Sequence, residues 1–313
     1  MSIAEFFNKA KPKADNGVAA EANCRNQYYL GLSNEGFHRL YYREWGDPDN
    51  ANTIICIHGL TRISHDFDEL AQALSQHYRV VCPDIVGRGN SDWFGNKDHY
   101  NITQYCADIN ALIAHLRVDE VHFIGTSMGG LIGMLLAGMA HTPIQSLILN
   151  DVGPLIKRGE LQAMGDYVGR SPIFTSRDEI YDYFTTIYHG SCALLQQKQI
   201  RRMVNYSAFK TDGGYRLHYD PKIGDAFRKH YTSFNFELWK YWEEIECPVM
   251  VLRGSESTFL TTDIVDKMAS THEDMKLVEI PKAGHTPLMK TQSEINIVSQ
   301  FFEDVINPSQ LDN

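Results

Sequence analysis

The stretch Gly125-Thr126-Ser127-Met128-Gly129, with Gly130 directly behind it, joins two apolar runs of different character. Residues 121–124 before it are typical of a short buried strand, and residues 131–139 after it are typical of a buried helix. A serine at such a turn has a strained backbone and projects its hydroxyl above the sheet, while the glycines remove side chains that would collide with the crossing backbone. The stretch therefore predicts a nucleophilic serine, Ser127, whose neighbouring helix N-terminus favours negative charge.

The rest of the chain alternates strand-like and helix-like segments, which indicates a mainly parallel sheet with helices on its faces. We expect strands at 28–32, 39–45, 53–57, 79–82, 121–124, 146–149, 249–252 and 276–280, the first two as an antiparallel hairpin. We expect helices at 66–76, 103–116, 131–139, 262–269 and 293–302. After Pro154 the alternation stops for roughly ninety residues, which contain helix-like stretches at 178–188 and 194–206 and no convincing buried strand. This segment is predicted to be a helical insertion.

Composition restricts the function. The 313 residues are 43% hydrophobic and 22% charged, as in an ordinary globular protein. The net charge of −10 and the lack of a basic block argue against nucleic acid as a partner, and an anionic substrate would need a local cation such as Arg62. The N-terminus has charged residues and no long apolar run, so we expect neither a signal peptide nor a membrane partner, and a cytoplasmic protein. Ile3, Phe6 and Phe7 could form one docking helical turn or belong to a mobile terminus.

The cysteines give no sign of a metal or redox site. Their spacing is wide and contains no C-x-x-C pair, so free thiols are favoured over disulfides. The six are Cys24, Cys56, Cys82, Cys106, Cys192 and Cys247. A cluster of His58, His65, Asp66 and Asp68 matches no common zinc signature, so no metal is expected there.

Three further segments follow predicted strands. In the first, His58-Gly59, the glycine lets the backbone turn so that the amide of Leu60 can point at a substrate oxygen, with the amide of Met128 as second donor of an oxyanion hole. The glycine-rich loop 83–92 lacks the spacing and lysine of a phosphate cradle and is interpreted as structural. In the third segment, His285 follows Gly284 after the last strand, at the sheet edge where a general base is needed.

These motifs in this order resemble the α/β-hydrolase fold superfamily, and within it the capped serine esterase-like members. The resemblance extends from about Tyr28 to the final helix. It implies an α/β fold with a mostly parallel eight-stranded sheet flanked by helices. It also implies an N-terminal extension at 1–25, a core at 26–153 and 245–313, and a helical cap at 154–244 over the active site.

The triad acid is the one departure from the family's usual pattern. Family members commonly carry an aspartate three residues beyond a glycine after the penultimate strand, whereas Gly254 is followed by Ser255-Glu256-Ser257. Some members supply the acid after the preceding strand, where this chain has Asp151. We favour Asp151 as the residue that orients His285. Glu256 is the alternative, and Asp263 comes third.

The predicted activity is cofactor-free hydrolysis of small-molecule carboxylic esters or lactones by Ser127, His285 and Asp151. A carbon–carbon bond hydrolase acting on a ring-cleavage product is the alternative within enzymes, and a catalytically silent ligand-binding protein is the alternative outside them. Whether the chain forms a homodimer stays open. The cap aromatic residues are expected to form cap core more than a substrate pocket. They are Phe174, Tyr181, Tyr183, Phe184, Tyr188, Phe234, Phe236, Trp239 and Trp242.

Overall fold

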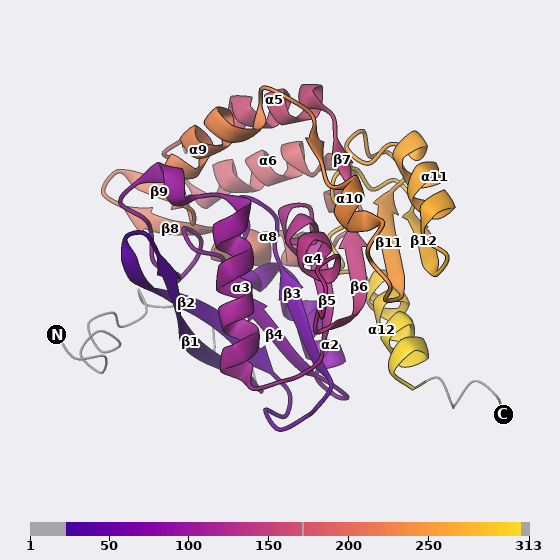
Figure 1. The fold of residues 1–313 in the computed structure, drawn as a ribbon. Helices are drawn as coiled ribbons and strands as arrows, with labels where there is room; N and C mark the ends of the chain where they lie inside the picture. The colour runs from indigo at the N-terminus through magenta and orange to yellow at the C-terminus, as the bar shows by residue number, and fades with distance from the viewer. Residues whose placement is uncertain (1–22, 171, 308–313) are drawn as a thin grey trace.

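The computed structural model describes residues 23–170 and 172–307, and an eight-stranded sheet forms its centre (Figure 1). The strand order is β1-β2-β4-β3-β5-β6-β11-β12. The strands are β1 (Cys24–Ser33), β2 (Gly36–Trp45), β3 (Thr53–Ile57), β4 (Arg79–Pro83), β5 (Val121–Thr126), β6 (Ile144–Asn150), β11 (Val249–Gly254) and β12 (Met275–Ile280). Strand β2 pairs antiparallel with both neighbours, and every pairing from β4 to β12 is parallel. The predicted α/β class and the mostly parallel eight-stranded sheet are confirmed.

Helices cover both faces of this sheet and bury the apolar strands between them. Helices α3 (Ile102–Leu116), α4 (Met128–Ala137) and α11 (Thr262–Thr271) pack on one face. Helices α2 (Asp68–Leu74), preceded by the 3-10 turn η1 (Ser64–Phe67), and α12 (Gln292–Ile306) pack on the other. A further 3-10 turn, η2 (Lys97–His99), precedes α3. Each side of the sheet therefore has its own buried cluster, which explains why β3 and β4 are buried at every residue.

Helix α4 begins at Met128, three residues before the predicted start, because the small residues after Ser127 already belong to it. The glycines there are required by close contact. A Cβ on Gly129 would lie 2.1 Å from the carbonyl oxygen of Ile57, and one on Gly125 would lie 2.4 Å from the carbonyl carbon of Gly129. Helix α4 thus packs against β3 at a distance that no larger residue allows.

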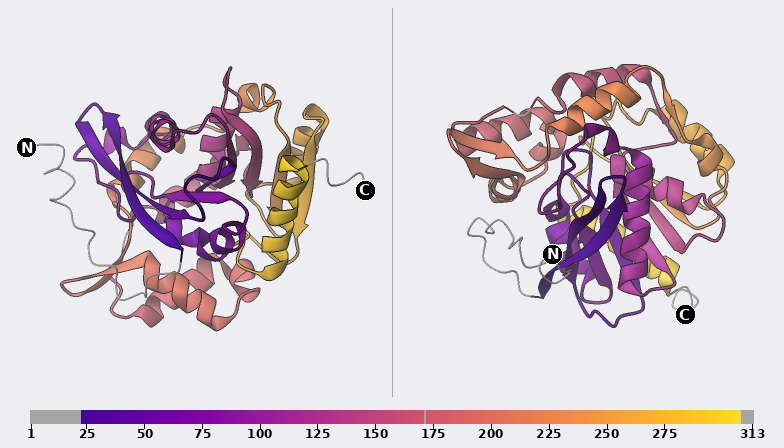
Figure 2. Two further views of the ribbon diagram at one scale, coloured as in Figure 1. Left: turned by 90° about the horizontal axis from the view of Figure 1, so that it is seen from below. Right: turned by 60° about the vertical axis from the view of Figure 1, so that its left-hand side comes forward.

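Residues 155–242, which we term the cap segment, lie across one end of the sheet in both views (Figures 1 and 2). The segment consists of β7 (Leu155–Ile156), α5 (Arg158–Tyr167), α6 (Arg177–Ile187), α7 (His189–Ala193), α8 (Gln197–Ser207), β8 (Ala208–Thr211), β9 (Gly214–Leu217), α9 (Lys222–Tyr231), β10 (Phe236–Glu237) and α10 (Trp239–Trp242). It is mainly helical, as predicted. The exact domain boundaries stay a prediction.

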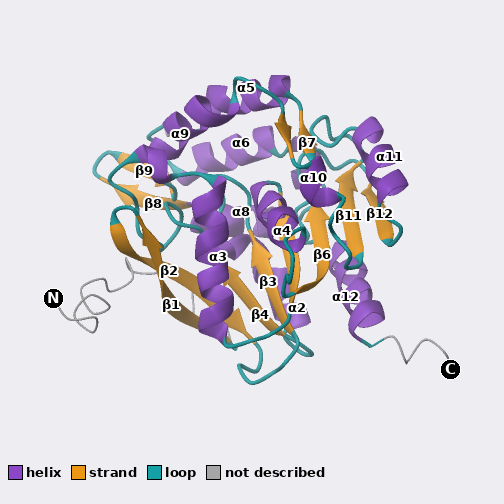
Figure 3. Cartoon of the chain, viewed as in Figure 1, coloured by secondary structure: helices purple, strands orange, loops and turns teal. Residues whose placement is uncertain are grey.

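The segment also contains four short, partly buried strands that the sequence did not predict. Strands β8 and β9 form an antiparallel hairpin, and β7 pairs with β10 (Figure 3). The turn between β8 and β9 is Asp212-Gly213, and Gly213 has a φ of +100°. Asp-Gly is a strong hairpin signal, but the flanking strands are only four residues long and only partly buried, so their periodicity is weak.

The cysteines, the helix lengths and the N-terminal residues concern three further expectations. All six cysteines are free thiols, as predicted. In the described part of the chain no helix is long and apolar enough to cross a bilayer. The interpretation of Ile3, Phe6 and Phe7 lies outside the described residues.

The contact of α4 with β3 predicts a difference between two glycines. Gly129→Ala should lower the free energy of unfolding by about 1–3 kcal/mol, because the new Cβ overlaps the backbone of Ile57. Gly159→Ala is the control, because no atom lies within 4 Å of a Cβ there and alanine favours the helix by up to about 1 kcal/mol. Urea unfolding of both variants measures the difference. Equal stability of the two variants would contradict the close contact.

Candidate active site

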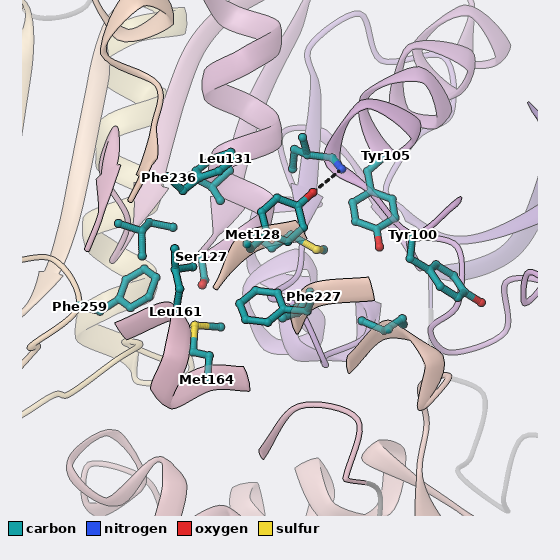
Figure 4. A pocket seen from close by; sticks show the side chains of 15 residues that line it. Tyr100, Tyr105, Ser127, Met128, Leu131, Leu161, Met164, Phe227, Phe236 and Phe259 are labelled. Atoms are coloured by element: carbon teal, nitrogen blue, oxygen red, sulfur yellow. Dashed lines mark hydrogen bonds between the residues drawn. The ribbon is translucent and has the colours of Figure 1, made fainter. Parts of the chain in front are cut away.

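Ser127 lies where β5 ends and α4 begins. Its backbone has φ +50° and ψ −112°, a conformation that L-residues rarely adopt and that neighbouring structure must hold in place. A hydrogen bond from β6 stabilises this conformation: the carbonyl of Asn150 accepts the N–H of Ser127 at 3.0 Å. The serine hydroxyl projects into a cavity (Figure 4). The structure thus has the strained turn that the sequence predicts.

His285 lies on the loop after β12 and reaches the serine. Its Nε2 is 3.1 Å from the Oγ of Ser127, and its Nδ1 is 2.6 Å from the Oδ2 of Asp151. The ring of Phe259 stacks on the imidazole with 4.2 Å between centroids. The imidazole is therefore fixed between a hydroxyl and a carboxylate, with one ring nitrogen for each.

Asp151 follows β6 and is completely buried. Its Oδ1 accepts the N–H of Gly254 at 2.9 Å, and its Oδ2 accepts the hydroxyl of Ser257 at 2.6 Å as well as the imidazole of His285. A carboxylate has acceptor capacity for all three of these donors. Asp151 is thus held in the site by a donor from each of three residues.

The structure places the other two candidate acids elsewhere. Glu256 is exposed, and its side chain forms no hydrogen bond or ion pair within the described residues. Asp263 is 65% exposed and pairs with Lys157 at 3.2 Å. Of the three carboxylates that the sequence offered, only Asp151 contacts His285.

Ser257 is a site residue that the sequence reasoning missed. Besides donating to Asp151, its hydroxyl accepts the N–H groups of Phe259 and Leu260 at 3.2 and 3.3 Å. Ser257 stands three residues beyond Gly254, the position where the resembling family commonly carries its aspartate. That offset was the available signal: the usual acid position here holds a hydroxyl that supports an acid on the neighbouring strand.

The predicted oxyanion donors, Leu60 and Met128, both line a cavity together with Ser127. Within the described residues neither N–H has a backbone acceptor, and Met128 is the first residue of α4, where no intrahelical partner exists. His58 fixes the peptide group of Leu60. Its Nδ1 donates to the carbonyl of Gly59 at 2.8 Å, and that carbonyl belongs to the same peptide unit as the Leu60 N–H. Because the peptide is trans and planar, the anchored carbonyl sets the direction of the N–H.

His58 is suited to this structural role because it stays neutral. Burial lowers its pKa to about 3, so Nδ1 carries a proton while Nε2 accepts the N–H of Ile85 at 3.0 Å. No group of three or more metal-binding side chains forms in the described residues. His58 therefore supports the backbone. Among the described residues, His58, His65, Asp66 and Asp68 do not come together as a set of metal ligands.

The glycine-rich loop 83–92 is structural, as predicted, but it also reaches the site. Asp84 caps the loop by accepting the N–H groups of Ser64 and Asn90, and burial raises its pKa. Arg88 is completely buried and donates to the carbonyl of Leu60 at 2.8 Å. Arg88 thus fixes the backbone after the first predicted oxyanion donor, a role that no local sequence pattern indicates.

Two cavities meet at Ser127. The first has an apolar wall built by the sheet edge and the cap segment (Figure 4). Its main side chains are Leu60, Tyr105, Leu131, Leu161, Met164, Phe227 and Phe236. The second also contains Ser127, and its wall combines His285, Arg62 and Asp66 with apolar side chains such as Met164 and Leu288. The serine therefore opens on an apolar cavity and on a second cavity that contains charged and titratable side chains beside its apolar ones, which we term the polar cavity.

The cap aromatic residues divide between core and cavity. Phe174, Phe184 and Trp242 are buried core, as expected for most of the set. Phe236 lines the apolar cavity and Tyr188 the polar one, whereas Phe234 is 78% exposed. Two pocket residues outside the predicted set, Phe227 and Tyr231, come from α9, the amphipathic helix that the insertion pattern obscured.

The short contact between His285 and Asp151 has a spectroscopic consequence. A proton shared at 2.6 Å between an imidazole and a buried carboxylate should give a resonance far downfield of the amide protons. Asp151→Asn should abolish this resonance, and Glu256→Gln should leave it in place, because Glu256 does not contact the histidine. Proton NMR of the three proteins at low temperature measures it. Loss of the resonance in Glu256→Gln alone would show that the acid was assigned wrongly.

Known proteins show the same fold and length. Residues 52–291 match the model of the alpha/beta hydrolase fold family. A 3-hydroxybutyrate-oligomer hydrolase from Cupriavidus necator is 40% identical over 288 residues, which cover 90% of this chain and 98% of that protein. Solved structures from Rickettsia typhi and Novosphingobium aromaticivorans, the second of an alpha/beta hydrolase, are 31% and 30% identical, with TM-scores of 0.83 and 0.81. They cover 90% and 91% of this chain and 99% of each structure. The chain therefore belongs to the alpha/beta hydrolase fold family.

Proposed function

We propose that this chain is a serine hydrolase that cleaves carboxylic esters through an acyl-enzyme intermediate. The observation that carries the proposal is the chain of hydrogen bonds from Ser127 through His285 to the buried Asp151. A nucleophile in contact with a base that is itself oriented by a third group is the arrangement that acyl transfer needs. Both cavities give a substrate access to the serine.

Acylation would begin when the Oγ of Ser127 attacks the ester carbonyl while the Nε2 of His285 takes its proton. The negative charge that forms on the carbonyl oxygen would be held by the N–H groups of Leu60 and Met128 and by the N-terminus of α4. His285 would then return the proton to the leaving alkoxide. In the second half, water activated by His285 would release the acid and restore Ser127.

Asp151 would act through His285. Its carboxylate would hold the proton on Nδ1, so that Nε2 is the free base that faces Ser127, and it would stabilise the imidazolium that forms in each step. Ser257 and the N–H of Gly254 would keep that carboxylate in place. No metal or organic cofactor takes part in this scheme.

The substrate class we propose is esters of short hydroxy acids. The Cupriavidus necator relative, which spans nearly the whole chain, is named as a hydrolase of 3-hydroxybutyrate oligomers. Such oligomers combine apolar methyl-bearing segments with polar ends, and the two compartments at Ser127 offer surfaces of both kinds. Two observations support this substrate class: the sequence similarity to the Cupriavidus necator hydrolase and the different linings of the two cavities at Ser127.

Hydrolysis of p-nitrophenyl esters of increasing acyl length, followed by absorbance, tests the proposal. The wild-type protein should prefer short acyl groups, and Ser127→Ala should lose about 10⁴-fold or more in kcat/KM, because the nucleophile is gone. Wild-type protein that hydrolyses none of the esters would contradict the proposal. Labelling of Ser127 by a fluorophosphonate would then favour the carbon–carbon bond hydrolase, and failure to label would favour the silent ligand-binding protein.

A further inference from the structure

The position of His285 divides the substrate between the two cavities. A general acid must lie within hydrogen-bond reach of the oxygen it protonates, so the leaving alcohol must be on the histidine's side of the serine. His285 lines the polar cavity and not the apolar one. The alcohol half of the ester therefore belongs in the polar cavity, and the acyl half in the apolar cavity between the sheet edge and the cap segment.

Arg62 is the cationic side chain of the polar cavity. Its Nε and Nη2 donate to the two carboxylate oxygens of Asp66 at 2.8 and 2.5 Å, and its guanidinium lies 4.6 Å from the ring centre of Phe184. Burial acts to raise the pKa of Asp66, but the adjacent Arg62 outweighs burial and holds that pKa below its ordinary value. The ion pair is therefore fully charged at neutral pH, and the plane of the guanidinium is fixed.

One edge of this guanidinium has no protein partner. The Nη1 group of Arg62 has no acceptor among the described residues, and it is not among their buried polar atoms that lack a hydrogen bond. Nη1 is therefore not sealed off from the space around it, and Arg62 is one of the residues that line the polar cavity. A buried, oriented arginine with an unused edge is a binding site for a planar anion, because guanidinium geometry matches a carboxylate.

We propose that Arg62 binds a carboxylate on the leaving half of the substrate, so that the enzyme cleaves the ester bond nearest the acid end of a hydroxy-acid oligomer. The inference rests on the proposed ester hydrolysis and adds the end of the chain that is recognised. In an ester of a 3-hydroxy acid, the leaving oxygen and the carboxylate are separated by a short chain of carbon atoms. His285 and Arg62 line the same cavity, so both groups face the space in which such a leaving group would lie.

The proposed cleavage releases one hydroxy acid from the acid end of the oligomer. The Oγ of Ser127 forms a bond to the carbonyl carbon, and the bond from that carbon to the alkoxy oxygen breaks. The serine proton passes through His285 to that oxygen, which leaves as the hydroxyl of a free hydroxy acid whose carboxylate was held by Arg62. Water then cleaves the acyl group from Ser127 and yields the shortened oligomer, which again ends in a carboxylate.

The test compares two substrates with the same ester bond, 3-butyryloxybutyrate and its neutral primary amide. Wild-type protein should favour the acid in kcat/KM by at least about tenfold, the value of one charge-assisted hydrogen bond. Arg62→Gln should reduce this ratio to about one. Because the ratio is taken within each protein, any fraction of misfolded variant cancels.

Arg170→Gln is the matched control. Like Arg62, Arg170 forms an ion pair with an aspartate four residues away, Asp166 at 3.8 Å, but the Arg170 side chain is 70% exposed. It should keep the wild-type ratio. A wild-type ratio of one, or an unchanged ratio in Arg62→Gln, would overturn the role of Arg62 while ester hydrolysis itself stands. Absence of hydrolysis with both substrates and with p-nitrophenyl butyrate would instead refute the proposed function, and this inference with it.

A binding measurement on the wild-type protein keeps the inference testable even where Arg62→Gln fails to fold. The product 3-hydroxybutyrate should inhibit hydrolysis of p-nitrophenyl butyrate at concentrations at least about tenfold lower than 3-hydroxybutyramide does. Equal inhibition by the acid and the amide would contradict a carboxylate site at Arg62.

Discussion

The backbone contact between α4 and β3 is the constraint on which the site depends. Gly129 lies so close to the carbonyl of Ile57 that the helix must begin immediately after β5, and Ser127 is left at φ +50° between them. The carbonyl of Asn150, the last residue of β6, accepts the serine N–H, and Asp151 directly follows that strand. The ends of three neighbouring strands thus meet at this contact, and Ser127, Asp151 and the predicted oxyanion donors lie together at one edge of the sheet.

Ser127 and His285 could be located from sequence because short local patterns mark them: a glycine-flanked turn between a strand and a helix, and a glycine-histidine loop after the last strand. The choice between Asp151 and Glu256 could only be a preference, because it depends on a distance between loops that are far apart in the chain. Ser257 and Arg88 act through contacts of the same long-range kind. The hairpin of β8 and β9 was missed for a different reason, since four-residue strands with little burial have almost no periodicity.

The supporting residues show how much of the site lies behind the reacting atoms. His58 fixes the carbonyl that shares a peptide with the Leu60 N–H, and Ser257 fixes the carboxylate that orients His285. Both residues are buried, and each uses one polar group to hold a backbone or carboxylate group of the site. In front of the serine lie two cavities, one lined mainly by apolar side chains and one that also contains His285, Arg62 and Asp66. This asymmetry gives an ester two distinguishable halves.

The proposed mechanism requires a covalent acyl group on Ser127 during turnover. Mass spectrometry of protein quenched with acid during turnover of p-nitrophenyl butyrate tests this directly. We expect the intact mass to rise by one butyryl group, and the modified peptide to be the one that contains Ser127. Continued turnover with no adduct, or an adduct on any residue other than Ser127, would contradict the mechanism.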